Sequence, residues 1–218
     1  MAYLNSSIGK KQLMAVTGLV WCGFVLTHML GNLLIFLGAD AYNWYAHTLT
    51  ANPFIYLAEA LLALTILVHV VDGLRVTVQN RAARQVKYAM VASGKKAPRF
   101  QSKFMAFHGM AILVFLILHL LTFKYGTAYT TVVRGHEVRD LYKLVVEVFH
   151  QPFYVVGYLF CMVLVGLHLS HGFYSAFATL GVFHPKHSPV IDKIGYLYGV
   201  IVALGFISQP LYVYLFAL

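Results

Sequence analysis

Six histidines lie inside or at the edge of long apolar segments of this 218-residue chain. Four of them lie in four different apolar segments: His28, His69, His119 and His168. An imidazole in hydrocarbon is costly unless it has a partner or a bound group. Because imidazole nitrogen is also a common ligand of transition metals, these side chains predict metal or redox chemistry within a membrane.

The composition indicates helices that cross a bilayer. The chain is 60% hydrophobic and 11% charged, whereas soluble domains carry about 25% charged residues. The sequence predicts an all-α integral membrane protein, one domain over residues 1–218 that forms a five-helix bundle. About 20 apolar residues are needed for each span, and the expected spans are 12–37, 53–80, 104–125, 152–180 and 190–217. The first is expected to be a retained helix, because no small-residue cleavage site follows a short apolar region.

Lysine and arginine set the expected orientation. Twelve of the 16 basic residues fall on one side of a five-span chain, in the N-terminal segment and in the second and fourth connections. This places the N-terminus in the cytoplasm and the C-terminus outside, and it explains the net charge of +9 by topology rather than by nucleic-acid binding. Apolar side chains at helical spacing between residues 138 and 149 predict a short interfacial helix on the outer side.

Depth within the spans groups the four histidines into two pairs. At 1.5 Å per residue, His28 and His119 lie roughly 25 and 24 Å from the inner ends of their spans, so they share a plane in the outer half. His69 and His168 each follow the first residue of their inward-running spans by 16 residues. They therefore share a second plane nearer the cytoplasm, roughly 24 Å from the outer ends. Two such pairs are what two bis-histidine haems stacked across a bilayer require.

Other interpretations of the histidines remain. Any one of them alone could be a hydrogen-bonded polar residue in a helix interface. Zinc needs four ligands near one point, which two planes of two histidines do not provide. His171 lies one turn from His168 and is either a neighbour or an alternative ligand. His108 has no partner at its depth and is expected to be interfacial, with a supporting or haem-propionate role as the alternative.

Short segments along nearly the whole chain share their order and spacing with one family. They are residues 27–32 (THMLGN), 41–47 (AYNWYAH), 69–73 (HVVDG), His119, and 168–175 (HLSHGFYS). In these segments the chain resembles the single-polypeptide, five-helix, di-haem cytochrome b membrane anchor of succinate dehydrogenases and menaquinol:fumarate reductases. The two cysteines form neither a disulfide framework nor a covalent haem-attachment motif, which agrees with b-type haem.

The resemblance implies that His28 and His119 bind the iron of a distal haem b, and that His69 and His168 bind a proximal one. It implies electron transfer between menaquinone or menaquinol near the outer face and a cytoplasmic iron–sulfur subunit. A flavoprotein subunit with FAD would carry the dicarboxylate site. The implied location is the bacterial cytoplasmic (inner) membrane, as a multi-pass protein. The direction of the reaction, the quinone type and dimerisation of the complex stay open.

A quinone site needs an apolar slot and a group that exchanges protons. Glu59 is the only carboxylate in the outer half of a span and is the candidate catalytic group for quinol-linked proton transfer. The alternative is a structural carboxylate, held by helix-end donors or kept protonated by burial. Asn43, Tyr45 and His47 are expected to line the quinone region. Arg75 either snorkels beside the aspartate one turn earlier or contacts a haem propionate.

Two other functional classes compete with this interpretation. The first is the cytochrome b of a formate dehydrogenase or hydrogenase, which also uses histidines in membrane helices but fits the loop segments less well. The second is a metal or proton transporter, for which acidic residues midway through the spans and an internal repeat are expected. The sequence contains neither of these features.

Overall fold

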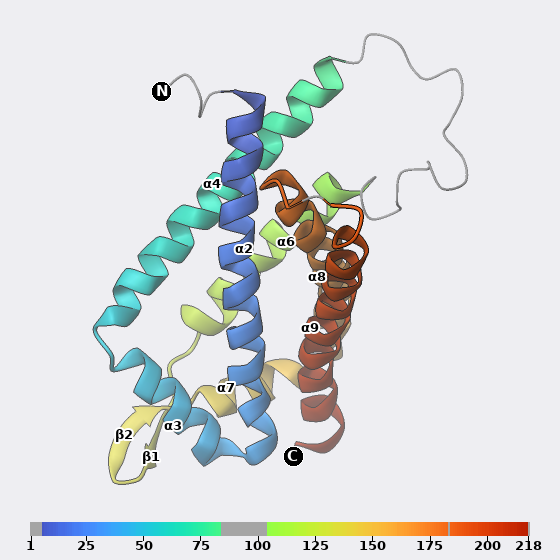
Figure 1. Ribbon diagram of the computed structural model, residues 1–218. Coiled ribbons are helices and arrows are strands. Elements are labelled where there is room, and N and C mark those ends of the chain that lie inside the picture. Colours follow the sequence, from blue (N-terminus) through green and yellow to red (C-terminus); the bar gives the residue numbers. More distant parts are fainter. Residues whose placement is uncertain (1–5, 84–103, 183, 218) are drawn as a thin grey trace.

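The computed structural model describes residues 6–83, 104–182 and 184–217 of the chain. Within these ranges, five helices are long and apolar enough to cross a membrane. They are α2 (Ser7–Asn32) with its 3-10 extension η1 (Leu33–Leu37), α4 (Phe54–Ala82), α6 (Met105–His119) with its π-helical extension η3 (Leu120–Lys124), α8 (Pro152–Thr179) and α9 (Ser188–Phe216). This confirms the all-α membrane architecture, and the helices match the expected spans to within a few residues (Figure 1). Most of the basic segment in the second connection, residues 84–103, lies outside the described ranges.

Local signals explain where these helices begin and end. The Ser6 hydroxyl caps α2 by accepting a hydrogen bond from the Gly9 amide (3.0 Å). Pro152 opens α8, where its missing N–H costs nothing. The extension of α2 ends at Gly38, whose φ of 92° lies in the left-handed region that glycine adopts readily.

Shorter elements form a layer at the end of the bundle where α9 finishes (Figure 1). We call this layer the outer cap, following the predicted orientation. It consists of α3 (Ala39–Thr50), the antiparallel strands β1 (Thr130–Val133) and β2 (His136–Arg139), and α7 (Leu141–Phe149). The predicted interfacial helix is therefore present as α7. It begins later than the apolar spacing indicated, because Val138 belongs to β2.

The outer cap has a core of its own. Asn43 of α3 is 1% exposed, and its amide nitrogen donates to Asp140 Oδ1 (2.8 Å) while its amide oxygen accepts from the Tyr142 backbone N–H (2.9 Å). Asp140 also caps α7 by accepting from the Lys143 amide (3.0 Å). Apolar side chains of α7 pack here against η1, α3, α8 and the end of α9. The cap is thus tied to the bundle by both polar and apolar contacts.

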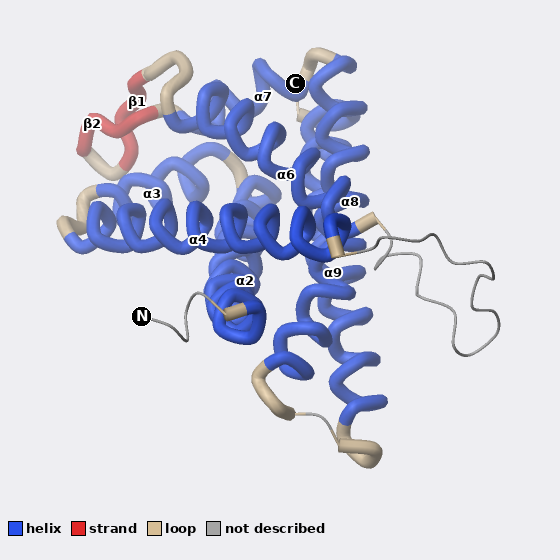
Figure 2. The backbone as a smooth tube through the Cα atoms, turned by 90° about the horizontal axis from the view of Figure 1, so that it is seen from above, coloured by secondary structure: helices blue, strands red, loops and turns tan. Residues whose placement is uncertain are grey.

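Helices α8 and α9 pack closely because small residues meet at their interface. A Cβ added to Gly199 of α9 would lie 2.5 Å from the Gly166 carbonyl oxygen of α8 and 2.1 Å from Ser170 Oγ. Such small-residue contacts are a common way for helices to associate in lipid. Figure 2 shows α4 running across the direction of α2, which is seen nearly end-on.

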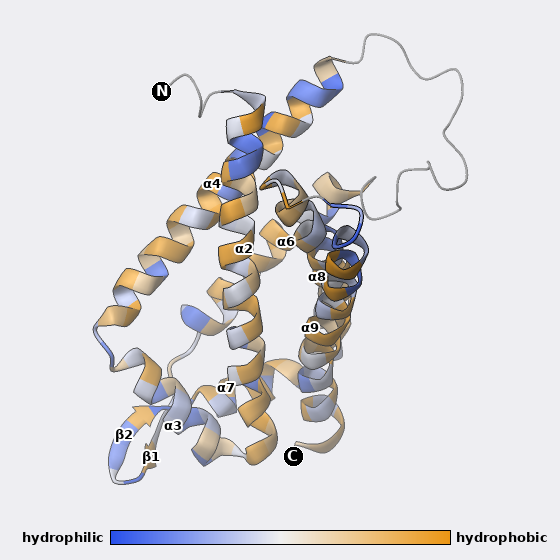
Figure 3. Ribbon diagram, viewed as in Figure 1, coloured by the Kyte–Doolittle hydropathy of each residue, from blue (hydrophilic) through white to orange (hydrophobic). Residues whose placement is uncertain are grey.

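The outward faces of the spans are strongly apolar. Side chains such as Leu57, Phe153 and Leu204 are 59%, 89% and 60% exposed in the isolated chain. Hydrophobic colour dominates the long helices in Figure 3, whereas hydrophilic segments collect toward their ends. Contiguous apolar exposure on this scale suits lipid rather than water, so the chain is a multi-pass membrane protein.

Candidate functional site

The four span histidines meet as two ring pairs. The ring centres of His28 and His119 are 5.9 Å apart, with an angle of 89° between the ring planes. Those of His69 and His168 are 6.4 Å apart, at 66°. We call these the outer and inner ring pairs. Each pair joins two different helices, α2 with α6 and α4 with α8.

Both separations fit a metal centre held between two imidazoles. A metal–imidazole bond is about 2 Å long and the ring centre lies about 1 Å further, so two rings on opposite sides of one ion have centres roughly 6 Å apart. The observed distances of 5.9 and 6.4 Å bracket this value closely. The residues present therefore fit axial ligation of two haem irons.

One ring of each pair is fixed through its Nδ1 atom. Nδ1 of His69 lies 3.0 Å from the Met14 carbonyl oxygen and 3.4 Å from Thr17 Oγ1. Nδ1 of His119 lies 3.0 Å from the Tyr158 hydroxyl. A metal-binding histidine usually donates its second ring N–H to such a partner, which fixes its tautomer and orientation. Both rings thereby keep Nε2 for a ligand.

The other two rings are held by packing. His28 stacks on Phe24 with ring centres 5.3 Å apart. The Asn32 amide nitrogen lies 3.5 Å from both ring nitrogens of His28, too far for a good hydrogen bond. Asn32 instead donates to the His28 carbonyl (2.8 Å) and accepts from the Tyr42 hydroxyl (2.7 Å). His168 is packed against α6, since a Cβ at Gly109 would lie 3.6 Å from its Cε1 atom.

Helices α2 and α8 each serve both ring pairs. Helix α2 carries His28 of the outer pair and the Met14 carbonyl beside His69 of the inner pair. Helix α8 carries His168 of the inner pair and Tyr158, which contacts His119 of the outer pair. Ten residues of α8 separate Tyr158 from His168, which corresponds to roughly 15 Å along the helix.

Two further histidines lie near the inner ring pair. His108 of α6 is 2% exposed and lies close enough to His168 to interact with it electrostatically, as does His171. Among the described residues, Nδ1 of His108 and Nδ1 of His168 are buried without a hydrogen-bond partner. His108 therefore lies within electrostatic range of the inner ring pair, without a hydrogen bond to any described residue at its Nδ1. The ring that faces His69 belongs to His168, and His171 lies one turn further along α8.

The predicted propionate contact, Arg75, lies beside Asp72 at the inner end of α4. Their side chains form an ion pair of 3.5 Å, in which Arg75 is 60% and Asp72 7% exposed. This is the geometry of a snorkelling arginine that neutralises a buried aspartate.

The residues predicted for the quinone region fall in separate places. Glu59 of α4 forms an ion pair with Lys124, the last residue of η3. Asn43 is committed to the hydrogen bonds of the outer cap. Tyr45 packs over Gly31 of α2, where an added Cβ would sit 2.4 Å from its hydroxyl oxygen. His47 stacks on His136 of the hairpin, with ring centres 6.2 Å apart.

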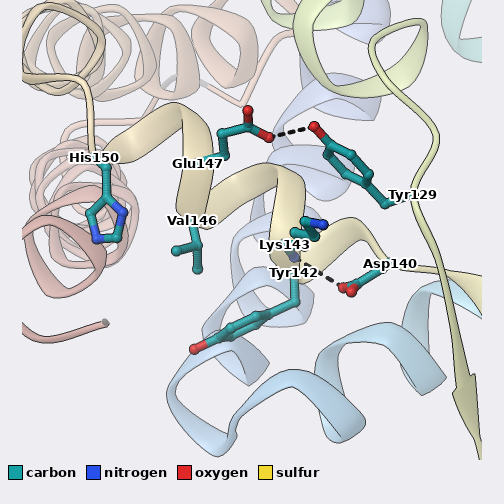
Figure 4. Close-up of a pocket in the computed structure, with 7 residues that line it drawn as sticks. All are labelled: Tyr129, Asp140, Tyr142, Lys143, Val146, Glu147 and His150. Carbon is teal, nitrogen blue, oxygen red and sulfur yellow. Dashed lines mark hydrogen bonds between the residues drawn. The ribbon is translucent and has the colours of Figure 1, made fainter.

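A cavity of about 650 Å³ opens on the surface of α7. Figure 4 shows its lining residues, Tyr129, Asp140, Tyr142, Lys143, Val146, Glu147 and His150. The Tyr129 hydroxyl donates to Glu147 (2.7 Å), and this hydrogen bond to a carboxylate raises the pKa of Tyr129. The Lys143 ammonium lies 4.3 Å from the centre of the Tyr129 ring. The lining includes neither ring pair nor Glu59, so this cavity is separate from the candidate redox site.

Within residues 6–83, 104–182 and 184–217, no three His, Cys, Asp or Glu side chains are grouped so that they could hold a metal ion. Comparison with protein-family models, with curated proteins and with solved structures finds no match to this chain.

Proposed function

We propose that this chain is the membrane-anchor cytochrome b subunit of a succinate:quinone oxidoreductase, of the quinol:fumarate reductase type. In this role it carries electrons between menaquinone or menaquinol near the outer face and a cytoplasmic iron–sulfur subunit. A flavoprotein subunit with FAD completes the complex and carries the dicarboxylate site. The observation that supports the proposal most strongly is the presence of two histidine ring pairs with spacings of 5.9 and 6.4 Å.

The chain's own residues account for binding and orientation. Nε2 of each ring would bind iron, while Met14, Thr17 and Tyr158 hold Nδ1 of the two anchored rings. Haem b supplies a one-electron iron couple when it is bound. The apolar helices keep water away from both ring pairs, which is one of the protein's means of setting a redox potential.

Glu59 supports the quinone part of the proposal. In the described part of the chain, it is the one acidic side chain in the half of a span next to the outer cap. It lies ten residues before His69 on α4, so it is roughly 15 Å nearer the outer side than the inner ring pair. We assign it the quinol-linked proton transfer.

Haem content of the purified complex is the first test. Pyridine haemochrome analysis with a redox titration should give two haems b per chain with separate potentials. One haem would leave one ring pair with only a structural role. The absence of haem would contradict the proposal and favour a transporter. Reduction of the haems by succinate would identify the partner enzyme. Reduction by formate or hydrogen would instead favour the cytochrome b of a formate dehydrogenase or hydrogenase.

Single alanine substitutions should remove one haem each. His28→Ala and His119→Ala should lose the distal haem alone, and His69→Ala and His168→Ala the proximal haem alone, because each haem loses one of its two axial ligands. Haem stoichiometry and reduced absorption spectra measure the loss. His171→Ala is the matched control and should retain both haems. If His171→Ala lost a haem and His168→Ala retained both haems, then His171 rather than His168 would be the haem ligand on α8.

A further inference from the structure

The ion pair between Glu59 and Lys124 joins two helices near the outer ring pair. Glu59 belongs to α4, and Lys124 is five residues beyond His119 of the outer pair. Their side chains are 42% and 37% exposed in the isolated chain. A single charge in hydrocarbon is strongly unfavourable, so each side chain needs the other to remain charged there.

The π-helical turn brings Lys124 back toward the face of His119. In an α-helix, five residues advance by about 140° beyond a full turn. In the π segment Leu120–Lys124, the Tyr125 amide bonds to the Leu120 carbonyl (3.0 Å), so five residues complete only slightly more than about one turn. The π segment therefore turns Lys124 closer to the face of His119 than an α-helix would. Such π-helical turns are frequent at functional sites.

Contacts from the outer cap hold this turn in place. The Arg139 guanidinium of β2 donates to the carbonyl oxygens of Phe123 (2.9 Å) and Lys124 (3.2 Å). The chain then folds back so tightly that a Cβ at Gly126 would lie 2.0 Å from the Thr122 carbonyl oxygen. The position of Lys124 is thus fixed by backbone geometry and by an arginine outside the span.

The ion pair is open to a molecule that arrives sideways from the bilayer. Aromatic and apolar side chains one or three residues away along the chain are exposed: Tyr56 (72%) on α4, Leu121 (57%) on η3, and Tyr125 (70%) just beyond. The Lys124 ammonium also lies 6.0 Å from the centre of the Tyr125 ring. A quinone ring and tail need this combination of apolar surroundings and a charged group.

We propose that Lys124 is a positioning residue of the outer quinol site, holding Glu59 as a carboxylate that accepts a proton from a hydroquinone hydroxyl. This inference rests on the proposed function, which supplies the loss of electrons from the quinol. In the proton step, one quinol O–H bond breaks, one O–H bond forms on Glu59, and the electron pair stays on the quinol oxygen. The ammonium of Lys124 then has no counter-ion, which favours release of the proton from Glu59 toward the outer side.

The test uses the complete complex with a short-chain naphthoquinol as the probe. Lys124→Met and Glu59→Gln should each lower kcat by about a hundredfold or more, because general acid–base catalysis typically contributes about 10²- to 10⁴-fold. The double variant should be no slower than the slower single variant, because the two side chains act as one unit. Lys124→Arg should restore most of the rate by keeping the charge. Lys143→Met removes a lysine of the outer cap and should leave kcat within twofold of the wild type.

Infrared difference spectroscopy tests the charge of Glu59 directly. A protonated Glu59 would give a C=O stretching band that disappears in Glu59→Gln. The resting wild-type complex should lack this band, because Glu59 is expected to be a carboxylate. It should appear at rest in Lys124→Met, where the carboxylate has lost its cation. A resting wild-type band from Glu59 would overturn the inference even if Lys124→Met fails to assemble.

Haem spectra distinguish failure of the Lys124 inference from failure of the proposed function. Normal haem content and wild-type kcat in Lys124→Met would overturn the inference alone. A wild-type complex without haem or quinol oxidation would overturn the proposed function, and the inference with it.

Discussion

Tyr158 is the side chain that would most directly affect one of the proposed haem ligands, His119, without binding iron itself. Its hydroxyl lies 3.0 Å from Nδ1 of His119. In the proposed haem ligation, Nε2 would bind iron and Nδ1 would donate its proton to the tyrosine oxygen, which would make the imidazole a more basic ligand. Tyr158→Phe should therefore keep both haems but raise the potential of the distal haem, by up to about 60 mV, a tenfold change for a one-electron couple. A redox titration followed at the two haem bands measures the shift.

Tyr154→Phe is the matched control, because Tyr154 lies one turn earlier on the same helix. It should leave both potentials unchanged. A shift of the proximal rather than the distal potential in Tyr158→Phe would contradict the assignment of the ring pairs.

Depth counting predicts both ring pairs and one residue beside them. His28 and His119, and His69 and His168, meet as ring pairs because rigid helices convert sequence position into depth. The same count would have found Tyr158, which lies six residues inside its span, as His119 does. The Met14 carbonyl could not be found this way, since a backbone acceptor is independent of residue type. The direction of Lys124 depends on a π turn, which has no sequence signature.

At the scale of elements, the crossing of α8 and α9 depends on Gly199. Gly199→Ala would place a Cβ 2.5 Å from a backbone oxygen that cannot move without displacing α8. Overpacking of this kind costs about 1–3 kcal/mol, so the midpoint of thermal unfolding in detergent should fall. Circular dichroism measures it. Gly157→Ala on α8 is the control, because nothing lies within 4 Å of its added Cβ, and an equal loss there would refute the packing argument.

The contacts of Asn43 favour a structural role over a role in quinone binding. Asn43→Ala leaves the Tyr142 amide without its acceptor and Asp140 without one donor. The expected loss is about 1–3 kcal/mol of stability for a buried unsatisfied group, with the KM for quinol unchanged. Thermal unfolding and quinol kinetics measure both, with exposed Thr48→Ala on α3 as control. A higher KM with normal stability would instead support the quinone role.

The five spans were predictable because each is a long apolar run, and length alone distinguishes it from a buried soluble helix. The outer cap was only partly predictable. The amphipathic spacing of residues 141–149 indicates α7, whereas α3 lies within residues 38–52, where only a connection between two spans was expected. The hairpin turns at Arg134 and Gly135, whose φ angles are 53° and 79°. Arginine is an unusual residue there, so the turn lacks the usual sequence signal.

For the whole molecule, the orientation is the main prediction. A cysteine at Thr131 in the hairpin should react with a membrane-impermeant thiol reagent in intact cells, because the predicted orientation places the outer cap away from the cytoplasm. A cysteine at Lys193, near the start of α9, should react only after the membrane is opened. The wild-type chain is the control, since Cys22 and Cys161 lie within spans. The reverse labelling pattern would invert the topology and place Glu59 near the cytoplasm.

The separation of Tyr158 and His168 on α8, one beside each ring pair, would also give the proposed electron carrier a response to voltage. Roughly 15 Å is about half of the 30 Å hydrocarbon core. A charge moved from one pair to the other therefore crosses about half of the membrane field, worth roughly 1.2 kcal/mol for every 100 mV. An energised membrane would thus change the distribution of a charge between the two pairs by about sevenfold per 100 mV, with no movement of the helices.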